Sequence, residues 1–121
     1  MYKKVTTALE NKLYLNVFED AWKFEDTEYN KNKIERYIML TEDGEVFGAF
    51  AYAFYDLKIG STIESLYPFK EKVSKINNKH KVTIEIAAFA VKKEHQGFKH
   101  FMQSVYYMNQ ELMNLNCDYC I

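Results

Sequence analysis

The residues best suited to chemistry lie between Val82 and Ile121. An apolar stretch, Val82 to Val91, is followed by a polar break from Lys92 to Gly97 and then by a long amphipathic segment. This order predicts a strand, a loop and a helix. The first backbone N–H groups of such a helix have no partner within it, and the helix dipole adds partial positive charge there. The loop is therefore a predicted site for a phosphate-bearing ligand.

One carboxylate, Glu85, interrupts the apolar strand. A carboxylate in a partly apolar setting can have its pKa raised toward neutrality and can then act as a general base. We therefore predict that Glu85 is the catalytic base. The alternative interpretation is structural, in which Glu85 points to solvent between Thr83 and Ala87 or is paired with a lysine.

Basic side chains flank the predicted phosphate loop at Lys92, Lys93, Lys99 and His100. Lysine neutralises phosphate as a point charge, without the bidentate geometry of arginine. The alternative is a solvated loop followed by the start of a helix, because lysine is usually exposed.

Metal and redox chemistry are not expected. His95 and His100 are five residues apart, without a carboxylate or cysteine at ligand spacing, so we predict no metal site. Cys117 and Cys120 form a C-x-x-C pair, but they follow a helix and enter a strand, which sends them to opposite faces. We expect two reduced thiols.

Local patterns predict the elements that position these residues. Thr7 and Glu10 fit a capping box, and Asp43-Gly44 fits a hairpin turn. Residues 25–35 are polar and aperiodic, which predicts a loop or a short irregular helix. The apolar periodicities predict helices at 10–24 and 98–115, strands at 36–40, 46–55, 82–91 and 117–121, and a connecting excursion with one or two short helices at 57–80. The order predicts an α/β sheet with helices on its faces.

Composition limits the class of protein. The 121 residues carry 16 basic and 17 acidic side chains and a net charge of −1, so one domain without a basic excess is expected. This balance favours neither a nucleic-acid partner nor a membrane surface. The first residues lead into no long apolar run, which predicts no signal peptide and no transmembrane span. With two cysteines and no export signal, the predicted compartment is the cytoplasm.

The strand, loop and helix resemble the central motif of the GNAT superfamily of N-acyltransferases, in which a strand ending in valine precedes a polar turn with Gln or Arg and glycines. The matching run is Phe89 to Gly97. The resemblance implies one GNAT-like domain over residues 1–121, with a central mixed sheet of about five strands flanked by helices and without the family's last strands. It also implies that acetyl-CoA or another acyl-CoA is the donor. The implied donor-binding residues are Phe89, Val91, Gln96, Gly97, Phe98, Lys99 and His100.

Within the superfamily, the acyl-homoserine lactone synthases and the N-acyl amino acid synthases are the most similar branch. They lack the later loop glycines, and this chain has Lys99 and Phe101 at those positions. The strand pattern around Glu85 and the run 66–69, which joins proline to aromatic residues, also resemble this branch. The branch's arginine position is Ala88 here.

The resemblance implies transfer of an acyl group from acyl-CoA, or from an acyl carrier protein, to a small-molecule amine. Glu85 would act as base, and a strand N–H near Phe89 would hold the oxyanion. The alternative is a non-catalytic, degenerate GNAT-like module for protein–protein assembly or ligand sensing.

Two further expectations concern apolar residues. The aromatic side chains predicted to line an acyl channel are Phe50, Tyr52, Phe54 and Phe89. The apolar last strand, 119–121, would leave an unpaired edge, from which we predict that the chain associates with a second copy.

Overall fold

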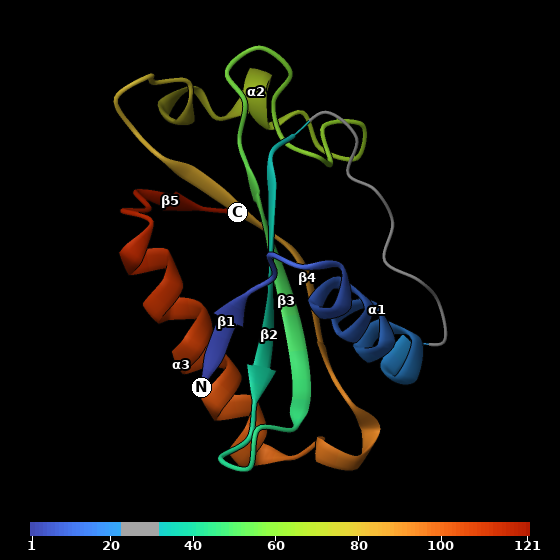
Figure 1. Ribbon diagram of the computed structural model, residues 1–121. Helices are drawn as coiled ribbons and strands as arrows, with labels where there is room; N and C mark the ends of the chain where they lie inside the picture. The colour runs from blue at the N-terminus through green and yellow to red at the C-terminus, as the bar shows by residue number, and fades with distance from the viewer. Residues whose placement is uncertain (23–31) are drawn as a thin grey trace.

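A computed structural model describes residues 1–22 and 32–121 and contains one five-stranded mixed sheet. Strands β1 to β5 follow one another across the sheet in sequence order; β4 and β5 run parallel, and the other neighbours run antiparallel. The elements are β1 (Tyr2–Lys4), α1 (Ala8–Trp22), β2 (Ile34–Leu40), β3 (Val46–Phe54), α2 (Phe69–Lys72), η1 (Ser74–Ile76), β4 (Thr83–Val91), η2 (Lys93–His95), α3 (Phe98–Asn114) and β5 (Tyr119–Cys120). Helices α1 and α3 lie on opposite sides of the sheet (Figure 1).

The predicted α/β class and the five-stranded mixed sheet with flanking helices are confirmed. The predicted loop at 25–35 falls mostly outside the described residues, as does the predicted end of the first helix at Phe24. In the described ranges, no helix is long and apolar enough to span a membrane.

The capping box that starts α1 is confirmed. The Glu10 backbone N–H donates to Thr7 Oγ1 at 3.1 Å, and the Thr7 N–H donates to the Glu10 carboxylate at the same distance. The carboxylate also pairs with Lys3 and accepts the Thr6 N–H. The Lys3 bond, followed by the Thr6 bond, lowers the pKa of Glu10 to about 2. The helix start is therefore fixed by reciprocal side-chain bonds.

Strand β3 is buried on both faces, as its alternation of small and aromatic residues predicts. Ala49 and Ala51 pack in the cluster that contains Tyr14 of α1. Phe50 and Tyr52 pack in the cluster on the α3 side. The prediction that these two aromatic side chains line an acyl channel is wrong, because both are fully buried in the core.

Two bulges interrupt the ladders of β3. Between β2 and β3, Met39 pairs with Gly48 and the next pair is Leu40 with Val46, so Phe47 is an extra residue. Between β3 and β4, Ala51 pairs with Ala88 and Tyr52 pairs with Ile86, which leaves Ala87 extra. A bulge bends the strand and redirects the following side chains. The bulge at Ala87 therefore changes the direction of β4 before its last four residues.

The last strand, β5, pairs along β4 through Thr83↔Tyr119 and Ile84↔Cys120. The Ile86 N–H extends this contact by donating to the Ile121 carbonyl at 3.2 Å. β5 is shorter than the predicted strand at 117–121. Both cysteine thiols are free, as expected.

Gly48 lies in β3 opposite Val91 of β4. A Cβ there would be 2.6 Å from Met39 Cε and 2.9 Å from the Ala90 carbonyl oxygen. Because the latter is backbone in a central ladder, Gly48→Ala should lower the free energy of unfolding by about 1–3 kcal/mol. Chemical denaturation measures this change. Gly97→Ala is the matched control, since no described atom lies within 4 Å of the Cβ it would add; equal losses in both variants would contradict the prediction.

Candidate functional site

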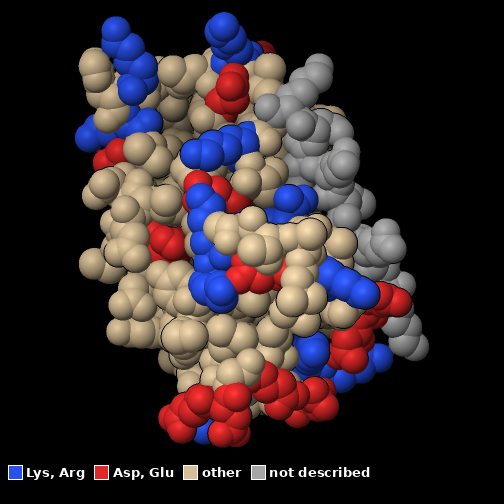
Figure 2. All heavy atoms as spheres, viewed as in Figure 1, with Lys and Arg blue, Asp and Glu red and all other residues tan. Residues whose placement is uncertain are grey.

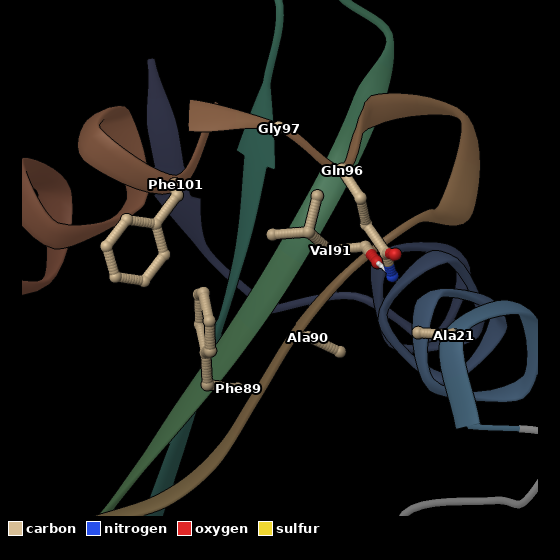
Figure 3. Close-up of a pocket in the computed structure, with 7 residues that line it drawn as sticks. All are labelled: Ala21, Phe89, Ala90, Val91, Gln96, Gly97 and Phe101. Carbon is tan, nitrogen blue, oxygen red and sulfur yellow. Dashed lines mark hydrogen bonds between the residues drawn. The ribbon is translucent and has the colours of Figure 1, made fainter. Parts of the chain in front are cut away.

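A pocket of about 440 Å³ lies where β4 ends and α3 begins (Figure 3). Its size falls in the range of small-molecule sites, about 300–1,000 Å³. The lining residues come from the end of α1, from the last residues of β4, and from the segment that runs from Gln96 into the first turn of α3. They are Ala21, Phe89, Ala90, Val91, Gln96, Gly97 and Phe101. The wall is mainly apolar, with one amide side chain.

Two hydrogen bonds donated by backbone N–H groups hold the turn after β4. The Lys92 N–H donates to the Phe47 carbonyl at 2.8 Å, which continues the ladder with β3 by one residue. The Lys93 N–H donates to Asp20 Oδ2, also at 2.8 Å, and ties η2 to the last turn of α1. The turn that forms one wall of the pocket is therefore anchored to both the sheet and α1.

Gln96 and Gly97 join this turn to α3. The Gln96 side-chain amide reaches back across the turn and donates to the Val91 carbonyl at 3.0 Å (Figure 3). Gly97 precedes the first residue of α3, and its carbonyl accepts the Phe101 N–H at 3.0 Å. No described atom occupies the space where a Gly97 Cβ would project. The entrance beside Gly97 is therefore open.

Two aromatic rings give the pocket its apolar character. Phe89 projects from β4, and Phe101 projects from the first turn of α3 (Figure 3). Phe101 is 52% exposed, although large apolar side chains are normally covered. Exposed aromatic surface around a concave site favours an apolar or amphipathic ligand.

The structure brings four of the seven predicted donor-binding residues together in this pocket, namely Phe89, Val91, Gln96 and Gly97. It places the other three elsewhere. Phe98 and Lys99 line a groove on the outer surface of α3.

His100 turns away from the pocket and packs its ring 4.8 Å from the Phe47 ring. Burial, followed by the positive charges of His95 and Lys99, lowers the pKa of His100. A neutral ring at this position is a weak partner for phosphate.

Sequence reasoning missed Ala21, Ala90 and Phe101 as lining residues. Ala21 and Phe101 belong to helical apolar stripes, and Ala90 belongs to the apolar strand. Their spacing therefore indicated only that they are core residues. Which member of a stripe faces a pocket depends on how each helix packs against the sheet. That packing is not encoded in spacing alone.

Glu85 is buried, at 4% exposure, and its partner is Thr62. The Thr62 N–H donates to Oε2 at 3.0 Å, and the Thr62 hydroxyl donates to Oε1. The alternative that Glu85 points to solvent is wrong, because the carboxylate is buried. In these two bonds its partner is a threonine rather than a lysine. Glu85 is absent from the described lining of the pocket. Phe89 is four positions further along β4, a distance of about 13 Å.

Thr62 is held in place by local turns of the excursion between β3 and β4. Asp56 Oδ1 accepts the Lys58 and Ile59 N–H groups at 2.7 and 2.9 Å, and these bonds lower the pKa of Asp56. Glu64 accepts the N–H and hydroxyl of Ser61, the residue before Thr62. Side chains that bond their own backbone thus shape the segment that covers Glu85.

Comparison of the chain with family models, with curated proteins and with solved structures finds no match in any of the three. The pocket and the buried carboxylate are therefore the observations from which a function is inferred.

The bonds between Thr62 and Glu85 predict a stability effect. Thr62→Val keeps the shape of the side chain but removes the hydroxyl donor from a buried carboxylate. We expect the free energy of unfolding to fall by about 1–3 kcal/mol, the cost of leaving a buried polar group unsatisfied. Thermal and urea unfolding measure this change in the free energy of unfolding. Ser65→Ala, at an exposed position of the same excursion, is the control; if the two variants were equally stable, Thr62 would not be holding Glu85.

Proposed function

We propose that the chain is a GNAT-type N-acyltransferase that binds acyl-CoA, or the equivalent arm of an acyl carrier protein, in the pocket between β4 and α3. The observation that carries this proposal is the convergence of Phe89, Val91, Gln96 and Gly97 on one pocket, since the family resemblance assigns these residues to the donor. The element order supports it too, because α3 connects the parallel strands β4 and β5.

The two ends of the pocket suit the two parts of such a donor. The first turn of α3 offers backbone N–H groups and partial positive charge to a pyrophosphate. Lys93 and Lys99 are exposed near this turn and add mobile positive charge. The rings of Phe89 and Phe101 suit the apolar part of the acyl-pantetheine arm. Of the two side chains at the family's glycine positions, Lys99 lines a different surface and Phe101 forms part of the pocket wall.

The proposed reaction forms an amide and breaks a thioester. The amine nitrogen attacks the thioester carbonyl carbon, the strand N–H near Phe89 stabilises the oxyanion, and the coenzyme A thiolate leaves. Glu85 takes the proton that the amine nitrogen loses and returns it to the departing sulfur. Because Glu85 and Phe89 are about 13 Å apart along β4, this proton transfer requires a chain of several water molecules between them. The Thr62 bonds hold the Glu85 carboxylate in position.

Isothermal titration calorimetry with coenzyme A, acetyl-CoA and a long-chain acyl-CoA tests the donor site. We expect saturable binding at one site. Gly97→Phe should weaken it at least about tenfold, because the new ring enters the open space beside the pocket. Ser65→Phe, at an exposed position away from the pocket, is the matched control and should leave the affinity unchanged.

A variant of the predicted base separates donor binding from acyl transfer. Glu85→Gln should bind the donor as tightly as the original chain but lose about 10²–10⁴-fold in acyl transfer once an amine acceptor is found. Absence of donor binding in the original chain, or equal binding in Gly97→Phe, would contradict the proposal.

A second candidate is a non-catalytic assembly module, and the outer surface of α3 favours it. Four exposed side chains there are large and apolar: Phe98, Met102, Tyr106 and Met113. The flank of the molecule that α3 forms shows few charged atoms (Figure 2). Within the described chain, β5 pairs with β4 on one edge only. An exposed apolar helix beside an unpaired edge strand fits a second copy of this chain.

Size-exclusion chromatography with light scattering tests this second candidate. At micromolar concentration the chain should elute as a dimer, and Met102→Glu with Tyr106→Glu should elute as a monomer because two charges would enter the apolar interface. Lys79→Glu, on the exposed excursion, controls for the change in charge. A monomeric original chain would exclude self-association.

A further inference from the structure

A cluster of potential metal ligands lies beside the turn between β2 and β3, and none of its residues lines the pocket. His95 Nε2 is 3.4 Å from Glu45 Oε1 and 3.6 Å from Glu94 Oε1. One ligand atom from each of the three residues lies within 4.8 Å of the others. Acidic side chains gather at this end of the molecule, at the bottom of Figure 2. The sequence predicted no metal site from the spacing of His95 and His100; Glu45 lies 50 residues from His95.

The spacing of these atoms suits a tetrahedral ion. Zinc binds imidazole nitrogen and carboxylate oxygen at about 2.0–2.2 Å, so two ligand atoms of a tetrahedral site lie about 3.3–3.5 Å apart. Both distances from His95 Nε2 are close to this value. A cation would neutralise the repulsion between the two carboxylates and so allow them to move closer together. With that movement the three side chains would occupy three positions of a tetrahedral site.

The imidazole is held in place by its neighbours. The His95 side chain is only 17% exposed, with ring centroids 6.2 Å from Phe47 and 5.0 Å from His100. On the opposite side, the Glu45 N–H donates to Thr41 Oγ1 at 3.1 Å. A fixed ring facing two carboxylates resembles the preorganised ligand sets of metal sites, in which a second shell orients the first.

We infer that Glu45, Glu94 and His95 form a binding site for a divalent transition-metal ion of the zinc type. Three protein ligands leave a fourth position for water, as in open zinc sites. One imidazole and two carboxylates favour zinc over magnesium, because magnesium demands near-ideal octahedral geometry and gives up its water reluctantly. The ion would join the β2–β3 turn to η2, which leads directly into Gln96 and Gly97. The site stands independently of the proposed acyl transfer.

Calorimetric titration of the untagged full chain with zinc chloride tests this site. We expect one zinc ion per chain. His95→Ala should lower the affinity at least about tenfold, and Glu45→Gln and Glu94→Gln should each lower it severalfold. His80→Ala and Glu42→Gln are the matched controls, because both residues are exposed and lie outside the cluster. Magnesium chloride should give no binding under the same conditions.

Two comparisons between variants keep the outcome decisive. The double variant Cys117→Ser/Cys120→Ser should keep its zinc affinity, which separates this cluster from the free thiols. The exposed glutamate variants should fold normally, so they test the site even if His95→Ala is unstable. Three results would overturn the inference: no zinc binding, affinity unchanged in the glutamate variants, or affinity lost only with the cysteines.

Discussion

Burial of β3 on both faces is the constraint on which the rest of the structure depends. Every residue from Val46 to Ala53 is buried, so the strand needs a helix on each side. Alanines on one face let α1 approach closely, and aromatic rings on the other fill the space beneath α3. Because β4 pairs with β3 along most of its length, this central packing also fixes where β4 ends. The candidate pocket lies at that end.

The sequence predicted the elements whose signals are local. The capping box at Thr7 and Glu10 depends on residues three positions apart, and the Asp43-Gly44 turn depends on adjacent ones; Gly44 indeed has a φ of +83°. The pattern of β3 predicted its burial on both faces, because a strand covered by two helices leaves no polar face. These features need no knowledge of distant parts of the chain.

The candidate site depended on contacts that sequence spacing does not show. Thr62 meets Glu85 across 23 residues, and Glu45 meets His95 across 50. The rotation of α3 about its axis turns Phe101 toward the pocket and leaves Lys99 on the outer surface. Aromatic residues in strands fill cores and line ligand sites alike, so spacing could not show that Phe50 and Tyr52 belong to the core whereas Phe89 reaches the pocket.

The proposed site for an acyl-CoA donor is the junction of β4 and α3. The most direct test is a ¹H–¹⁵N NMR titration of the chain with coenzyme A, which reports every backbone amide separately. We expect the largest chemical-shift changes on Phe89 to Phe101, with little change in β1 and in the excursion around Thr62. Changes centred elsewhere, or no changes at saturating coenzyme A, would contradict this proposal.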